Sequence, residues 1–149
     1  MMRDRSTFVK GTNVLFDAWL VSRATAGVLD AALVPSGLTA DEFGVYSVLT
    51  SSEAMTPSEL AGWMAAPPTT VSSYVKRIEQ RGHLVKERNP RDGRSFVLRL
   101  TPEGRAAHAA AGACFQPVLD AVESGLAGRE ATVRRALATL REVLEALDQ

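Results

Sequence analysis

A short run of hydroxyl and cationic side chains is the part of this 149-residue sequence best suited to chemistry. One face of the run is apolar at helical spacing, with Val71, Tyr74, Val75 and Ile78. The opposite face carries Thr69, Thr70, Ser72, Ser73, Lys76 and Arg77. Small hydroxyl side chains let a helix approach base edges closely, and Lys or Arg binds guanine or phosphate. The run therefore predicts a helix that contacts nucleic acid.

A second cationic group lies between two stretches of alternating side chains, residues 84–89 and 95–100. The second stretch should place Phe96, Leu98 and Leu100 on one face and Val97 and Arg99 on the other. The dipeptide Asp92-Gly93 favours a hairpin, because glycine accepts a positive φ. Such a hairpin would expose Arg91 and Arg94, with Asp92 placed to hold one guanidinium group in a bidentate pair. An arginine at a hairpin tip suits the negative potential of a narrow minor groove.

The charge distribution supports a basic module on an acidic scaffold. Residues 67–105 carry nine cations and four anions, a net charge of +5. The whole chain has 17 cations and 17 anions, so the remainder has a net charge of −5. Local asymmetry of this kind favours nucleic-acid binding even when the total charge is zero.

Length and composition indicate one domain, or a small domain with an oligomerisation arm. The single cysteine, Cys114, excludes an internal disulfide. No apolar run is long enough to span a membrane, and the start of the chain lacks an apolar signal core. We therefore expect a cytoplasmic protein without a membrane partner.

The remaining pattern predicts a mainly α fold with a small β-wing, an α+β class in which a winged helix-turn-helix is flanked by dimerisation helices. Helices are expected at about 13–33, 40–51, 57–64, 69–81, 101–124 and 129–148, with Pro117 a candidate kink. Thr39 with Glu42 and Thr56 with Glu59 form capping boxes. The short helices 57–64 and 69–81 form the helix-turn-helix.

The terminal helices are amphipathic and predict a homodimer. In the last helix, an apolar heptad stripe consists of Val133, Leu137, Leu140, Leu144 and Leu147. We expect residues 1–36 to form an N-terminal dimerisation helix, 37–104 the winged helix-turn-helix, and 105–149 the C-terminal dimerisation helices.

Four stretches together resemble the MarR family of winged helix-turn-helix regulators. They are SELAGWM (58–64), PTTVSSYVKRIEQRG (68–82), RDGR (91–94) and LRLTPEG (98–104), and the resemblance runs over 38–104. The family fold is a homodimer that presents two winged modules to palindromic DNA, most often as a repressor. The resemblance implies that the six polar residues of 69–77 lie in the major groove and that Arg94, held by Asp92, lies in the minor groove. The chain departs from the family at Ser73, often arginine, and at the turn 65–68.

Many family members also sense a small aromatic or lipophilic acid. The corresponding candidates here are Trp19, Arg23, Phe43 and Tyr46, which would offer an apolar cleft with a cation for a carboxylate. Core packing of the aromatic residues is the alternative interpretation of the same pattern.

Functions other than DNA binding have less support in the sequence. A redox-responsive regulator would have to use Cys114, which has no obvious neighbouring cation to lower its pKa. His83 and His108 do not form a metal-binding pattern, so neither a metal nor another cofactor is expected. No nucleophile–base pair or phosphate loop predicts an enzyme. A winged-helix adaptor that binds protein instead of an operator stays open, and the salt dependence of DNA binding would separate it.

Overall fold

The structure is a computed structural model that describes residues 10–148. The predicted N-terminal region 1–36 therefore lies partly outside the described residues, as does Gln149 at the other end. The chain divides into two compact units, the first ending at Cys114 and the second beginning at Phe115.

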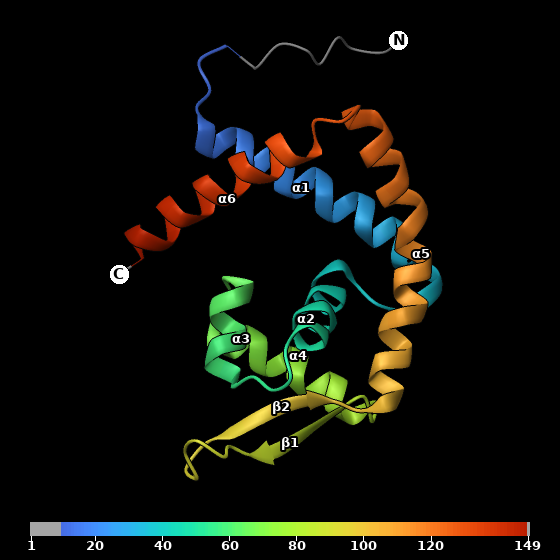
Figure 1. The fold of residues 1–149 in the computed structure, drawn as a ribbon, viewed down its shortest axis with the longest axis vertical. Coiled ribbons are helices and arrows are strands. Elements are labelled where there is room, and N and C mark those ends of the chain that lie inside the picture. The colour runs from blue at the N-terminus through green and yellow to red at the C-terminus, as the bar shows by residue number, and fades with distance from the viewer. Residues whose placement is uncertain (1–9, 149) are drawn as a thin grey trace. The chain divides into compact units, whose positions relative to one another are not determined.

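The first unit contains most of the elements (Figure 1). They are α1 (Val14–Leu33), a short 3-10 turn η1 (Val34–Ser36), α2 (Ala40–Ser51), α3 (Pro57–Met64), α4 (Pro68–Gln80), β1 (Leu84–Arg88), β2 (Phe96–Leu100) and the start of α5 (Pro102–Leu126). The helices α2, α3 and α4 pack together beside the hairpin, which gives the predicted winged helix-turn-helix (Figure 1).

Local sequence signals fix the starts of these helices. Both capping boxes are confirmed, because the hydroxyl of Thr39 accepts the Glu42 N–H and the hydroxyl of Thr56 accepts the Glu59 N–H, each at 3.2 Å. Thr101 also caps its helix, with its hydroxyl 3.0 Å from the Gly104 nitrogen. Helices α2 and α3 therefore begin at the predicted residues, and the boundaries of the other helices agree with the predicted ranges to within about two residues.

The turn between α3 and α4 has a strained backbone. Ala65 ends α3 in the left-handed region, with φ at 48°, where an alanine Cβ is disfavoured. Helix α4 then begins at Pro68 without a side-chain cap. The turn that departs from the family pattern is therefore also the one that lacks a side-chain cap.

The wing is an antiparallel pair in which Leu84 lies opposite Leu100 and Arg88 lies opposite Phe96. Met55 adds a bridge to Leu98, which ties the loop before α3 to the sheet. The predicted alternation does not separate buried from exposed residues. Val97 and Leu98 are both buried, while Phe96 is exposed.

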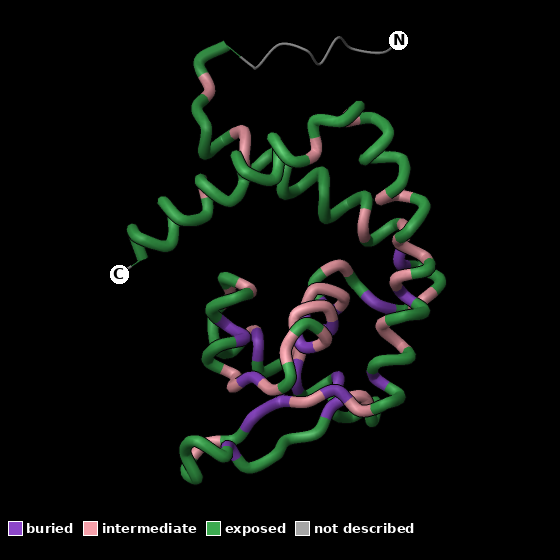
Figure 2. The backbone as a smooth tube through the Cα atoms, viewed as in Figure 1, coloured by how far each residue is buried: buried purple, intermediate pink, exposed green. Residues whose placement is uncertain are grey.

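The core of the first unit lies among α2, α3, α4 and the hairpin (Figure 2). Its fully buried side chains include Tyr46, Leu60, Val71, Ile78 and Leu98. Helix α1 contributes Leu33 at its end, but its apolar residues Leu15, Trp19, Leu20 and Val28 are exposed. Burial is therefore concentrated in the winged module.

The second unit consists of the rest of α5 and α6 (Glu130–Leu147). Helix α5 continues through Pro117, so this proline does not end it. The heptad stripe of α6 is largely exposed, including Val133, Leu137, Leu144 and Leu147. No helix within residues 10–148 is long and apolar enough to cross a membrane.

Candidate nucleic-acid interface

Helix α4 separates its apolar and polar residues as the sequence predicted. Val71, Val75 and Ile78 are buried against the rest of the module. Thr69, Ser72, Ser73, Lys76 and Arg77 are exposed, and Thr70 is half-buried. The structure therefore brings all six predicted contact residues of this helix to its surface.

Tyr74 does not belong fully to the apolar stripe. It is half-buried, and its hydroxyl donates a hydrogen bond of 2.8 Å to Asp41 at the start of α2. This hydrogen bond, with burial and the nearby charge of Asp41, raises the pKa of Tyr74. The ring also supports Arg77, whose guanidinium carbon lies 5.1 Å from the ring centroid.

Arg77 of α4 and Arg81, which follows the last residue of α4, share one carboxylate of α2. The Oε1 atom of Glu42 lies 3.0 Å from Arg81 and 3.5 Å from Arg77, while its Oε2 accepts the Thr39 N–H at 3.2 Å. Burial alone would lower the pKa of Arg81, but hydrogen bonding to Tyr46 and Glu42 raises it. Glu42 therefore joins α2 to the flank of the predicted recognition helix.

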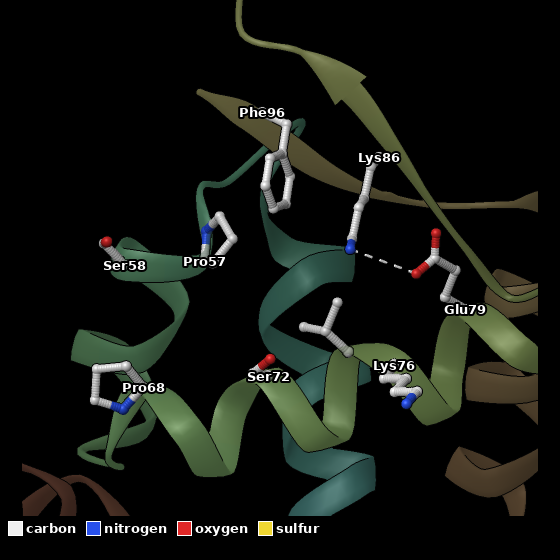
Figure 3. Close-up of a pocket in the computed structure, with 9 residues that line it drawn as sticks. Pro57, Ser58, Pro68, Ser72, Lys76, Glu79, Lys86 and Phe96 are labelled. Atoms are coloured by element: carbon white, nitrogen blue, oxygen red, sulfur yellow. Dashed lines mark ion pairs between the residues drawn. The ribbon is translucent and has the colours of Figure 1, made fainter. Parts of the chain in front are cut away.

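A hollow of about 400 Å³ separates α4 from the wing (Figure 3). Phe96 and Lys86 project into it from the hairpin, opposite Ser72 and Lys76 of α4 (Figure 3). Lys86 lies 5.0 Å from the Phe96 ring centroid and 3.6 Å from Glu79. The ion pair with Glu79 therefore joins the wing to α4.

The tip of the wing is organised by Asn89, a role that the sequence did not reveal. Asn89 is buried, its amide nitrogen donates to the Ser95 hydroxyl at 2.9 Å, and its Oδ1 accepts the Arg91 N–H at 3.0 Å. Asparagine commonly closes such backbone turns. The loop between the strands spans residues 89–95, so it is longer than a two-residue hairpin turn.

Two details of the predicted tip are wrong. Gly93 does not adopt a positive φ, because the turn is closed by the side chains of Asn89 and Asp92. Asp92 accepts the backbone N–H of Arg94 at 3.1 Å, and no ion pair joins it to Arg91 or Arg94 within the described residues. Both guanidinium groups are therefore exposed on a loop that other side chains fix.

The predicted effector residues lie in different surroundings. On α1, the guanidinium carbon of Arg23 lies 5.4 Å from the ring centroid of the exposed Trp19. On α2, Phe43 stacks on His108 with centroids 5.2 Å apart. Tyr46 is fully buried, and its hydroxyl is 2.8 Å from His83 Nδ1. Core packing therefore explains Tyr46.

The remaining candidates for chemistry have structural roles or no partners. His108 Nε2 is 3.0 Å from the Ser47 hydroxyl, and burial lowers the pKa of His108. Cys114 is a half-buried free thiol. In the part of the chain that the structure describes, no group of three or more His, Cys, Asp or Glu side chains could hold a metal ion.

Comparison with known proteins identifies the module. Residues 36–95 match the family model described as the MarR family. The chain is 32% identical over 78 residues to the HTH-type transcriptional repressor Rv2887 of Mycobacterium tuberculosis. The aligned region covers 52% of this chain and 56% of that protein. It is 26% identical over 88 residues to the multiple antibiotic resistance protein MarR of Salmonella typhimurium, covering 59% and 61%. The chain thus spans just over half the length of the curated relatives that it matches.

The similarity in structure extends further along the chain. The M. tuberculosis transcriptional regulator MosR, crystallised in complex with DNA, superposes with a TM-score of 0.79 at 28% identity, covering 93% of this chain and 100% of that one. These relatives are named as regulators of transcription, in agreement with the prediction that the chain is not an enzyme. The winged helix-turn-helix of this chain is therefore similar in sequence to the MarR family over residues 36–95, and the chain is similar in structure to a solved transcriptional regulator.

Proposed function

We propose that this protein is a homodimeric repressor that binds an inverted-repeat operator in double-stranded DNA. The observation that carries the proposal is the joint exposure of the polar face of α4 and of the arginines at the wing tip. Both surfaces belong to one module with a buried core. A helix and a hairpin held in fixed relation can enter neighbouring grooves of one duplex.

In this proposal α4 reads the major groove. Thr69, Ser73 and Lys76 occupy the outer face of the helix, opposite the buried stripe, with Thr70 and Ser72 on its flanks. Threonine and serine hydroxyls bond bases or phosphates, and Lys76 binds guanine or phosphate. Arg91 and Arg94 reach the minor groove, where negative potential attracts arginine.

Dimerisation would cover the apolar faces that the chain leaves exposed. Trp19 of α1 and Leu137 of α6 are each 53% exposed, and further large apolar residues lie beside them. Contiguous apolar faces of this kind indicate a protein interface. Two modules on a two-fold axis predict operator half-sites about 34–36 Å apart, or one turn of DNA.

The relatives support both DNA binding and repression. Rv2887 is named a transcriptional repressor, and MosR was crystallised with DNA. A small acidic effector would use Trp19 and Arg23, with Phe43 as a further apolar contact. Tyr46 would join such a site only by leaving the core, because its hydroxyl is already bonded to His83.

A titration of labelled duplex DNA tests the proposal. We expect Lys76→Ala to weaken binding by about tenfold and to reduce the salt dependence, since each phosphate contact contributes a slope of about −0.9. The control is Arg135→Ala, which removes an exposed cation from α6. Equal binding by both variants would contradict the assignment of α4 as the recognition helix.

A further inference from the structure

Arg77 differs from Lys76 in having a protein partner. Both are exposed cations of α4. Arg77 lies against the ring of Tyr74, and its Nε is 3.5 Å from the Glu42 carboxylate. For Lys76, the described residues offer no ion pair within 4 Å. Of these neighbouring cations, Lys76 is therefore available to a ligand, whereas Arg77 is already in contact with Glu42 and Tyr74.

Glu42 is well placed to restrain Arg77. The side chain of Glu42 is 5% exposed and contacts the Thr39 N–H, Arg81 and Arg77. The backbone N–H of Glu42 also donates a hydrogen bond to the Thr39 hydroxyl. A buried carboxylate attracts a cation more strongly than an exposed one does, because the local dielectric is low. Moving Arg77 to a DNA phosphate would leave Glu42 with Arg81 as its single cation partner.

The restraint on Arg77 also comes from the ring beneath it. Tyr74 is itself fixed by the hydrogen bond of its hydroxyl to Asp41. Asp41 and Glu42 both lie in the first turn of α2. One helix start therefore holds the guanidinium group of Arg77 through a charge and its supporting ring through a hydrogen bond.

We propose that Glu42 limits the affinity of the module for DNA by holding Arg77 against α2, so that Arg77 makes no phosphate contact. This inference rests on the proposed function, since it assigns a role at the same surface. Restraint of Arg77 would affect non-specific binding more than base readout. Phosphate contacts strengthen binding to every sequence, so withholding one cation per protomer lowers non-specific affinity and leaves base readout to the other residues of α4.

The chain offers a matched control for this carboxylate. Glu59 occupies the same capping-box position in α3 that Glu42 occupies in α2, and it accepts the Thr56 N–H at 2.8 Å. Glu59 has no ion pair within 4 Å in the described residues, and its pKa is lowered mainly by the hydrogen bonds of Thr56, with a smaller effect of the Arg91 charge. Glutamine preserves a capping box, so Glu42→Gln and Glu59→Gln each remove one negative charge while retaining the cap.

The experiment measures binding to a random-sequence duplex over a salt series. Two phosphate contacts per dimer change the slope of log K against log salt by about 1.8. We expect Lys76→Ala to flatten the slope by this amount and Arg77→Ala to leave it unchanged. Glu42→Gln should steepen it by about 1.8 and tighten binding roughly tenfold or more at 0.1 M salt. Glu59→Gln should leave the slope unchanged.

The double variant Glu42→Gln/Arg77→Ala separates release of Arg77 from a general loss of negative charge. Its slope should return to the wild-type value. A double variant as steep as Glu42→Gln, or a slope flattened by Arg77→Ala in the wild-type background, would overturn the proposal. The second comparison does not depend on the folding of Glu42→Gln, because Arg77 is exposed.

A measurement without DNA distinguishes failure of this inference from failure of the proposed function. Hydrogen exchange at the Arg77 Nε–H, followed by nuclear magnetic resonance, should be slower in the wild type and Glu59→Gln than in Glu42→Gln. Equal rates in all three would refute the restraint even if DNA binds. Absence of duplex binding at low salt by the folded wild type would refute the proposed function, whatever the exchange rates.

Discussion

The winged module and the terminal helices use similar apolar residues in different ways. The module buries Val45, Leu60 and Ile78 completely within one chain. The helices α1 and α6 leave Trp19 and Leu137 about half exposed. Burial of apolar surface stabilises a fold only where a partner surface is present. The module is therefore complete by itself, whereas the exposed faces of the terminal helices are suited to a second copy.

The largest effect is expected from a substitution in the core of the module. Ile78→Ala should lower the free energy of unfolding by about 2–5 kcal/mol, because it removes a fully buried side chain and leaves a cavity. Urea unfolding followed by circular dichroism measures the change. Gln80→Ala, an exposed position at the end of the same helix, should change it by less than about 0.5 kcal/mol. Similar losses in the two variants would contradict the burial described here.

The next largest effect is expected from a substitution that disrupts dimerisation through the terminal helices. Leu137→Asp places a charge on the apolar stripe of α6 and should convert the proposed dimer to a monomer, with operator affinity at least about 100-fold weaker. Sedimentation and operator titration measure the two quantities. Ala138→Asp, on the polar side of α6, is the matched control. A dimer that tolerates both substitutions must use another surface.

A smaller effect is expected at the wing. Arg94→Ala should weaken operator binding by about tenfold, since one minor-groove contact is lost from each protomer. Arg94→Lys keeps the charge and should recover part of the affinity. Fluorescence anisotropy on a fixed operator measures both variants. Unchanged affinity in Arg94→Ala would show that the wing tip does not contact the operator.

The smallest effect is a pH dependence within the module. Burial lowers the pKa of His108, so the unfolded chain binds its proton more readily than the folded chain does. The contribution of neutral His108 to the free energy of unfolding is therefore full above the pKa of the unfolded chain, about 6.5. It is lost as the pH falls through the lower pKa of the folded chain. Thermal unfolding between pH 7.5 and 5 should show less pH dependence in His108→Gln than in the wild type. Identical dependence would exclude His108 as the cause.

The sequence predicted the elements of the module because their signals are local. Thr39 with Glu42 and Thr56 with Glu59 define helix starts within four residues of chain. Gly82, with φ at 75°, follows the end of α4, where glycine is the common residue. The apolar stripe of α4 likewise follows from spacing alone. Such patterns are sufficient to identify the fold and to select the polar face of α4.

The missed features depend on residues far apart in the chain. Glu42 meets Arg81 across 39 positions, and Tyr46 meets His83 across 37. No local pattern distinguishes a capping carboxylate from one that also binds two arginines. At the wing, the Asp-Gly signal indicated the correct turn region, but the buried amide of Asn89 determines its geometry. These contacts arise from tertiary packing.

Selection of binding sites from random duplexes shows whether the protein recognises a specific DNA sequence as a dimer. Purified protein is mixed with a pool of random-sequence duplex DNA, and the retained fraction is sequenced over several rounds. We predict enrichment of a short inverted repeat with half-sites about one helical turn apart, and loss of this enrichment in Lys76→Ala. Folded, dimeric protein that enriches no motif at low salt would contradict it and would favour a winged-helix adaptor that binds protein.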